Sequence, residues 1–218
     1  MGIKDTVQRW AGFLSPPSPN LNISHKIKEL LVELDNQAKL LDIGSGKRRL
    51  SCRAINMDIK FFPGVDVIGD AHNPPFKDDY FDLVIARAVI EHVKDPRRTV
   101  SQIYRILKKG GCVYAEVPFL QPYHCAPDDF QRYTLSGLEN LFKDFKKLDS
   151  GFCVGPTGAL LGILQEYIAL FIGIPIARGI IYFLLGWIFF PLRYLDLLFA
   201  KRKKASLIAS SLYFLGKK

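Results

Sequence analysis

Two glycines after a short apolar run are the first residues whose spacing points to chemistry. The segment LLDIGSGKRRL, Leu40 to Leu50, reads as a buried strand that ends near Asp42 and continues into Gly44 and Gly46. Glycines at such a turn let the main chain approach a ligand closely. The dinucleotide pattern G-x-G-x-x-G needs a third glycine where Arg49 stands. We therefore expect a nucleotide-like cofactor other than a nicotinamide dinucleotide.

Acidic residues end two later apolar runs and strengthen this expectation. Asp58 follows AINM, and the pair Asp70-Ala71 follows VIG. Because the carboxyl ends of parallel strands lie at one edge of a sheet, these residues are expected beside the glycine turn. Asp58 is suited to accept hydrogen bonds from two ribose hydroxyls, and Asp70-Ala71 is placed to meet an adenine edge. The three features together are far more specific than a glycine pair alone.

A second group of reactive side chains lies in VPFLQPYHCAPDDFQRYT, residues 117–134. His124 is the candidate general base, because the pKa of an unperturbed imidazole is near neutrality. Asp128 would orient His124 or bind substrate, and Arg132 would hold an acidic group such as phosphate. The alternative is a structural His124 that only hydrogen-bonds the loop. His92, in EHV, is expected to be structural, and we expect no metal site.

Short apolar runs separated by turns predict the elements that position these residues. The runs KLLDI, AINMDI, VDVIGD, FDLVIA and CVYAEVPF are typical of buried parallel strands. DPRRTVSQIYRILKKGG has the apolar spacing of a helix, which its glycine pair is expected to close. This order predicts an α/β sheet. The links after the first two strands are too short for full helices, so another segment, such as the N-terminal one, must cover part of one face.

These motifs resemble the class I S-adenosylmethionine-dependent methyltransferases. LLDIGSG, INMDI, VIGDAHNPPF, FDLVIARAVIEHV and GGCVYAEVPF follow the family's order, in the type 11-like branch where Asp-Ala precedes LPF, FD and EHV. The resemblance covers about residues 38–150. It implies a Rossmann-like sheet with truncated first helices, S-adenosylmethionine as the cofactor, and an antiparallel last strand. FKKLDSGFCV and SLIASSLYFLGKK would supply the final two strands, on either side of an apolar helical insert.

The resemblance also assigns the cofactor residues. The methionine end is flanked by Asp42, Gly44, Ser45 and Gly46, the ribose by Asp58 and Ile59, the adenine by Asp70 and Ala71, and the methyl group by Arg87. The family usually has glycine where Arg48 stands, which makes the geometry of the turn the open point. The basic triplet Lys47, Arg48 and Arg49 would either hold the cofactor's carboxylate or remain in solvent or at a membrane.

Residues 157–204 are far more apolar than the remainder of the chain. Between Tyr167 and Leu192 the only charge is Arg178. Two helices, about 159–177 and 179–199, approach the roughly 20 residues that a spanning helix needs, with breaks expected at Gly173, Pro175 and Pro191. If the strands on either side belong to one sheet, a single crossing is excluded, which leaves a re-entrant hairpin or a helix pair in the interface. A helical lid or dimer interface is the alternative.

Charge and composition support a membrane partner. The net charge of +9 suits an anionic surface, and KRKK, Lys201 to Lys204, follows the apolar segment as expected on the cytoplasmic side. No run mixes basic and aromatic residues as a nucleic-acid platform would, so no nucleic-acid partner is expected. We divide the chain into an N-terminal segment with a proline-rich linker (1–20), a methyltransferase domain (21–156 and 205–218) and a hydrophobic helical membrane-associated insert (157–204).

The expected function is methyl transfer from S-adenosylmethionine to a hydrophobic or lipid-linked acceptor at the cytoplasmic face of a membrane. The protein would be peripheral, monotopic or re-entrant, and an oxygen nucleophile is favoured. One alternative is a methyltransferase acting on a soluble glycan or small molecule, with the insert as an anchor or as the interface of a homo-oligomer. Another is a non-catalytic membrane scaffold, against which Asp42, Asp58 and Asp70 argue, because a scaffold has no use for them.

Overall fold

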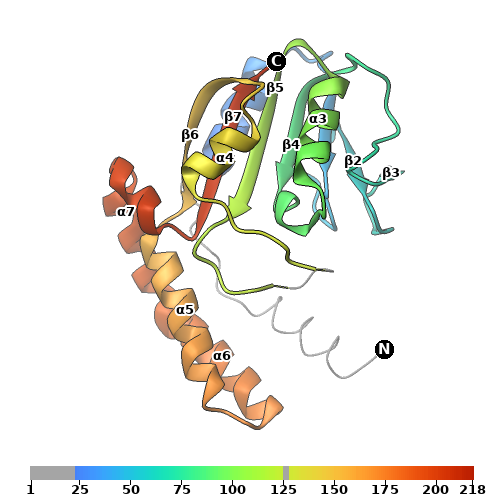
Figure 1. The fold of residues 1–218 in the computed structure, drawn as a ribbon. Helices are drawn as coiled ribbons and strands as arrows, with labels where there is room; N and C mark the ends of the chain where they lie inside the picture. The colour runs from blue at the N-terminus through green and yellow to red at the C-terminus, as the bar shows by residue number, and fades with distance from the viewer. Residues whose placement is uncertain (1–22, 125–127) are drawn as a thin grey trace.

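A seven-stranded mixed sheet is the framework of the molecule (Figure 1). The computed structural model describes residues 23–124 and 128–218. The strand order β3-β2-β1-β4-β5-β7-β6 confirms the predicted α/β class and its Rossmann-like form. The predicted N-terminal segment and proline-rich linker lie outside the described residues.

Apolar runs become the central strands because both faces of the sheet are covered. The parallel strands are β1 (Leu40–Ile43), β2 (Ala54–Asp58), β3 (Val67–Ile68), β4 (Phe81–Arg87) and β5 (Leu107–Pro118). The last two strands are β6 (Lys146–Val154) and β7 (Ser211–Lys217). β7 runs antiparallel to both β5 and β6, between which it lies, as the family resemblance implied.

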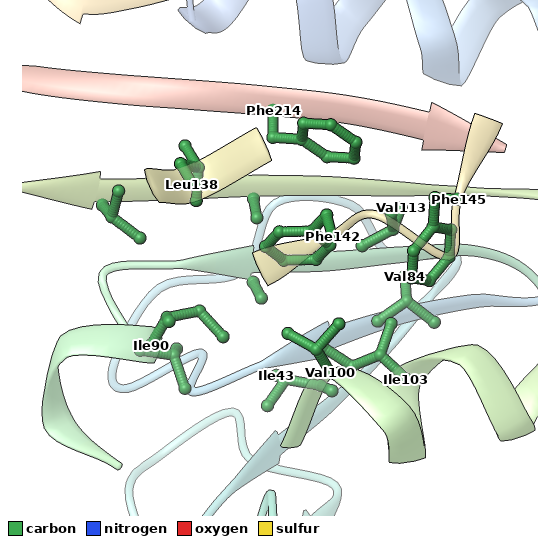
Figure 2. Packing of buried hydrophobic residues seen from close by; sticks show 14 of the residues in the cluster. Ile43, Val84, Ile90, Val100, Ile103, Val113, Leu138, Phe142, Phe145 and Phe214 are labelled. Atoms are coloured by element: carbon green, nitrogen blue, oxygen red, sulfur yellow. The ribbon is translucent and has the colours of Figure 1, made fainter. Parts of the chain in front are cut away.

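Helices α3 (Pro96–Ile106) and α4 (Leu135–Leu141) cover one face of the sheet, next to the short turns η1 (Ile90–His92) and η3 (Lys203–Ile208). In this core the rings of Phe142 and Phe214 stack with their centroids 4.8 Å apart. Figure 2 shows Val100 and Ile103 of α3 beside Ile43 of β1, within the same buried cluster. This packing fixes the carboxyl ends of β1 and β4 relative to each other.

No helix links β1 to β2 or β2 to β3 within the described chain, so these connections leave the opposite face of the sheet open. Helix α2 (Ile23–Glu33) covers that face instead. Ile27 of α2 is buried against Leu40, Leu83 and Ile85 of the sheet. The predicted truncation of the first helices is therefore correct, and an N-terminal helix takes their place on this face.

The predicted end of the helix in residues 95–111 is wrong. α3 ends at Ile106, and Gly110 and Gly111 lie inside β5. A Cβ on Gly111 would lie only 3.0 Å from the carbonyl oxygen of Lys108 and 3.1 Å from that of Asp82 in β4. The glycines therefore allow a close approach of β5 to β4, where a helix cap was expected.

The apolar segment forms a helical hairpin that projects away from the sheet (Figure 1). It comprises α5 (Pro156–Leu170), a turn at 171–174 and α6 (Pro175–Phe189), followed by η2 (Pro191–Leu195) and α7 (Asp196–Phe199). The turn falls at the predicted breaks Gly173 and Pro175, earlier than the predicted helix boundary at 177–179, because Pro175 occupies the first position of α6, where its missing N–H costs no hydrogen bond. The helical run Pro175–Phe199 has 25 residues, a mean hydropathy of 1.6 and little burial, so it is long and apolar enough to cross a membrane.

The hairpin leaves and rejoins the same edge of the sheet. Val154 at the end of β6 pairs with Ser211 at the start of β7. At its base, the carboxylate of Asp196 is buried and accepts hydrogen bonds from the main-chain N–H groups of Thr157 (2.8 Å) and Gly158 (3.1 Å) in α5. An acid in this position stabilises the start of a helix. The contact therefore joins the two ends of the insert.

Candidate functional site

The glycine turn after β1 has the backbone that its sequence requires. Gly44 and Gly46 have φ angles of +66° and +58°, in the left-handed region that favours glycine. A Cβ on Gly44 would lie 2.3 Å from Cγ2 of Val89, whereas one on Gly46 would meet nothing within 4 Å. Gly44 thus packs against the segment after β4, while Gly46 borders open space.

Asp58 at the end of β2 holds this turn in place. Its Oδ2 accepts a hydrogen bond from the N–H of Gly46 at 2.9 Å, and its Oδ1 accepts one from the N–H of Lys60 at 3.0 Å. A carboxylate offers about four lone-pair sites, so Asp58 can still accept hydrogen bonds from ligand hydroxyls. The adjoining Ile59 is exposed. This arrangement suits a ribose beside the glycine turn.

Asp70 and Ala71 lie just beyond β3. The carboxylate of Asp70 accepts hydrogen bonds from the main-chain N–H of His72 (2.8 Å) and lies 2.7 Å from its Nδ1. The backbone hydrogen bond is the main reason that the pKa of Asp70 is lowered, so it remains a carboxylate near neutral pH. Ala71 is buried in the core beside it.

Buried acids and arginines gather at the ends of β1, β4 and β5. Burial raises the pKa of Asp42 from 3.8 to about 7, against the opposing effect of Arg87. Burial also raises the pKa of Glu116 in β5, whose Oε2 lies 3.6 Å from Nε of Arg87. Glu116 was not among the site residues predicted from the sequence. The available signal was an acid two residues before the end of a buried strand.

The basic triplet separates into three different environments. Lys47 lies over the ring of Phe62, 6.0 Å from its centroid. Arg49 contacts both carboxylate oxygens of Asp66 at 3.1 Å. Arg48 interacts electrostatically with Asp42 and Glu116, and burial is the main cause of its lowered pKa. Within the triplet, Arg48 is the residue whose charge is coupled to the acids of the site.

The residues at this edge fit the predicted cofactor. The hydroxyl of Ser45 is buried without a hydrogen-bond partner among the described residues, beside the open space at Gly46. Asp42 and Glu116 offer carboxylates for an ammonium group, and Arg48 offers a guanidinium for a carboxylate. Asp58 and Asp70 offer acceptors for hydroxyl and amino groups. Together these groups match the amino acid, ribose and base of S-adenosylmethionine.

A second cluster forms where η1 meets the loop after β5. Nε2 of His124 lies 3.7 Å, and Nε2 of His92 3.8 Å, from Oε1 of Glu91. The two imidazole rings meet edge to face with centroids 5.0 Å apart. Glu91 is fully buried, which raises its pKa to about 7. His124 was predicted from the sequence as a catalytic residue, whereas its contacts with Glu91 and His92 were not predicted.

The loop that carries His124 is tied down by Asp129 and Arg132. Asp129 accepts a hydrogen bond from the main-chain N–H of His124 at 3.0 Å and pairs with the guanidinium of Arg132. Arg132 also donates to the carbonyl oxygens of Gln121 and Pro122. The donors of Arg132 thus serve the loop itself, whereas the sequence suggested that they would hold an acidic substrate.

Asp128, the third predicted catalytic residue, contributes its main chain. Its carbonyl oxygen contacts Nδ1 of His92, and its side chain is exposed. The carboxylate beside His124 belongs to Asp129, whose Oδ2 lies 3.5 Å from Nδ1. Asp128 and Asp129 are adjacent in the sequence, and only the loop conformation distinguishes them.

A cavity of about 310 Å³ joins this loop to the helical hairpin. His124 and Gln121 line it from the loop, and Gln165 and Glu166 line it from α5. Arg193 of η2 also borders it, with an Nε that is buried and has no partner in the described chain. The side chain predicted to activate the acceptor therefore faces a space that the hairpin helps to form.

Comparison with known proteins identifies the domain. Residues 31–115 match the family model described as a methyltransferase domain. A demethylmenaquinone methyltransferase of Thermotoga maritima is 29% identical over 39% of this chain and 45% of its own length. A 2-methyl-6-phytyl-1,4-hydroquinone methyltransferase of Oryza sativa is 43% identical over 22% of this chain and 15% of its own. An uncharacterized methyltransferase of Bacillus subtilis is 38% identical over 28% of this chain and 22% of its own. The matches span less than half of each relative.

Solved structures share the fold at low sequence identity. A phosphoethanolamine N-methyltransferase of Haemonchus contortus in complex with S-adenosylmethionine has a TM-score of 0.55 and 17% identity, covering 91% of this chain and 52% of that one. A putative sarcosine dimethylglycine methyltransferase of Galdieria sulphuraria has a TM-score of 0.58 and 13% identity, covering 98% of both chains. The cyclase SpnF has a TM-score of 0.56 and 18% identity, covering 88% of this chain and 80% of its own. These likenesses show the fold, and the family model supports a methyltransferase domain in residues 31–115.

The two glycines of the turn provide a test of cofactor placement. Gly46→Ala is expected to weaken the binding of S-adenosylmethionine about tenfold or more. The added Cβ would project into the open space at the turn, where the cofactor is expected to lie. The backbone strain should cost about 1–2 kcal/mol of stability. Isothermal titration calorimetry and urea unfolding measure the two effects. Gly64→Ala is the matched control, since Gly64 has a φ of +96° and open space but lies away from the site. An equal loss of affinity in both variants would contradict the placement.

Asp42 predicts a specific pH dependence of stability. Its pKa is about 7 in the folded protein and near 3.8 in the unfolded chain, so the folded state binds the proton more tightly. The stability that it contributes is therefore present below pH 4 and is lost as the pH rises toward 7. Without cofactor, the free energy of unfolding of Asp42→Asn relative to the wild type should rise by up to about 1.4 kcal/mol per pH unit over this window. A difference that does not vary with pH in urea titrations would exclude this behaviour.

Proposed function

We propose that this chain, whose residues 31–115 form a class I S-adenosylmethionine-dependent methyltransferase domain, methylates a hydrophobic or lipid-linked acceptor at a membrane. The observation that carries the proposal is the cavity shared by His124 and the apolar hairpin. An acceptor held in this cavity would contact the residue suited to activate it, while the exposed apolar side chains of the same hairpin would contact lipid.

The domain match and the edge of the sheet support the cofactor. S-adenosylmethionine supplies an electrophilic methyl group on a sulfonium. Gly46 leaves room for the cofactor, Asp58 accepts from its ribose, and Arg48 offers a charge for its carboxylate. Arg87 is held by Glu116 at the end of β4, next to the proposed path of the acceptor. These residues bind and orient the reactants, which is the main requirement of an in-line methyl transfer.

Activation of the acceptor is placed at His124. An oxygen nucleophile must lose a proton during methylation, and an imidazole is suited to accept it. His124 is partly exposed, lines the cavity and has Asp129 3.5 Å from its Nδ1. Burial lowers its pKa, which keeps the imidazole neutral and able to accept a proton. The names of the quinone and phytyl-hydroquinone methyltransferase relatives support a hydrophobic acceptor.

The hairpin is the proposed membrane contact. Its turn carries large exposed apolar side chains, among them Phe171, Ile174 and Ile176. The charges nearest the turn, Glu166 and Arg178, are paired with each other at 3.2 Å. Because the hairpin returns to the edge it left, it would enter one leaflet and emerge on the same side, as a re-entrant or interfacial element. Lys201 to Lys204 follow it, where anionic headgroups would attract them.

Membrane association can be tested at the turn of the hairpin. The triple variant Phe171→Ser, Ile174→Ser and Ile176→Ser removes exposed apolar area and should weaken binding to phosphatidylcholine–phosphatidylglycerol vesicles by roughly 100-fold or more. Vesicle co-sedimentation measures this change. The matched control replaces the exposed residues Val32, Ile68 and Leu148 of the domain by serine and should bind like the wild type. Wild-type protein that stays in the supernatant as a dimer would favour a dimer interface instead.

The enzymatic proposal is tested at His124. His124→Ala should leave the affinity for S-adenosylmethionine within about twofold of the wild type and lower methyl transfer at least 100-fold, the usual range for a group that handles a proton. The assay uses radiolabelled cofactor with a phytylated hydroquinone and, separately, a lipid extract as acceptors. His72→Ala controls for loss of an imidazole outside the loop that carries His124, and because His72 contacts Asp70, its transfer rate is measured at saturating cofactor. Normal turnover in His124→Ala would remove this residue from the mechanism.

A further inference from the structure

Three potential metal ligands meet beside the cavity. Nε2 of His92, Nε2 of His124 and Oε1 of Glu91 all lie within 4.8 Å of one another, and the two measured pairs are 3.7 and 3.8 Å apart. Donors bound about 2.0–2.1 Å from one zinc ion in tetrahedral geometry lie roughly 3.3 Å apart. The two distances to Glu91 therefore need a contraction of about half an ångström to enclose an ion, and the two imidazole nitrogens would approach each other by at most about 1.5 Å.

Glu91 is the part of the cluster that most needs a partner. Its side chain is 0% exposed, and neither carboxylate oxygen has a hydrogen-bond partner among the described residues. A buried acid without a partner is destabilising, and such groups are usually paired or bound to a metal. The side-chain groups close to it are the two imidazole nitrogens, which are themselves metal ligands when neutral.

The outer contacts of both histidines aim the same nitrogen at Glu91. Nδ1 of His92 contacts the carbonyl oxygen of Asp128, so it carries the proton and leaves Nε2 with a free lone pair. Nδ1 of His124 makes no hydrogen bond among the described residues but lies 3.5 Å from Oδ2 of Asp129, and the negative charge of this carboxylate favours a proton on Nδ1. A carbonyl or carboxylate behind the distal ring nitrogen is the usual support of a metal-binding histidine.

We propose that Glu91, His92 and His124 bind one divalent metal ion, with zinc as the first candidate. Two imidazoles and one carboxylate are a ligand set found in catalytic zinc sites, which keep a further position open. His124 is the most exposed of the three and lines the cavity, so the open position would face the proposed acceptor. The proposal departs from the sequence-based expectation of no metal, because Glu91 and His124 are distant in sequence and only the fold brings them together.

A metal here would deepen the proposed function, and this part of the inference rests on it. Nε2 of His124 would then be a ligand, so it would no longer take the proton itself. The ion would bind the hydroxyl oxygen of the acceptor and lower its pKa, as bound metals do for water. The proton would leave to solvent through the cavity, and the alkoxide or phenolate would remain on the metal, facing the methyl donor.

Calorimetric titration of the metal-stripped full chain with ZnCl₂ tests the site without any acceptor or cofactor. One saturable site per chain is expected, weakened more than about 100-fold by His92→Ala, His124→Ala or Glu91→Gln. Asp129→Asn should weaken it roughly tenfold, as expected for an outer partner. His72→Ala and Glu139→Gln are the matched controls and should bind zinc like the wild type. Circular dichroism of each variant, taken without metal, checks that it is folded.

The outcomes separate this inference from the proposed function. Absence of saturable zinc binding by the folded wild type, or equal weakening by His72→Ala, would overturn the metal site. Methyl transfer by metal-stripped protein at the wild-type rate would overturn the catalytic use of the ion while leaving the methyltransferase proposal intact. Failure of S-adenosylmethionine to bind, with zinc binding retained, would instead sink the proposed function alone.

Discussion

The position of β7 between β5 and β6 is the constraint on which the remaining structure depends. The last strand of the chain forms hydrogen bonds to both neighbours, so the sheet is incomplete until the apolar insert has been made and has returned. The insert therefore lies between two neighbouring strands, and the pairing of Val154 at the end of β6 with Ser211 at the start of β7 brings its two ends together. This closure places the base of the hairpin beside the loop after β5. It also explains why one cavity is shared by the loop that carries His124 and the base of the hairpin.

The candidate site brings several acidic side chains together in buried positions, where burial disfavours their charged forms. Asp42, Glu116 and Glu91 are all buried at the carboxyl edge of the sheet, and burial is the first cause of the raised pKa in each. Such an arrangement stores unfavourable energy that a bound ligand can release, which is typical of functional sites. The arginines Arg48 and Arg87 offset part of it. The fold supplies the positions, and the close packing of β1, β4 and β5 prevents the acids from moving away.

Much of this architecture was predictable from local pattern. The apolar runs, the glycine turn and the acids after β2 and β3 are short-range features, because each depends on residues within one strand and the turn that follows. The hairpin was predictable as two apolar helices with breaks at Gly173, Pro175 and Pro191, although the helix boundary itself was placed a few residues too late. The glycine pair in β5 was misread because its purpose is contact with another strand, which a local pattern does not record.

The parts that escaped prediction depend on distant residues. Glu91 belongs to the candidate site because it lies beside His124, and Glu116 because it lies beside Arg87. In each pair the two residues come from different elements. The choice between Asp128 and Asp129 depends on how one loop turns. The separate roles of Lys47, Arg48 and Arg49 could not be predicted from the sequence, because they depend on the neighbours that the fold brings to each side chain.

The buried contact of Asp196 with the start of α5 has a consequence for which molecules can be modified. Because it ties both ends of the insert together, it fixes the base of the hairpin, which would then act as a spacer at the proposed membrane. α5, with its 15 residues, is about 22 Å long. On the proposed orientation, that length sets the height of the catalytic loop above the lipid. Acceptors would then be selected by reach: a reactive group carried too close to the bilayer, or too far from it, would miss the methyl donor whatever its chemistry.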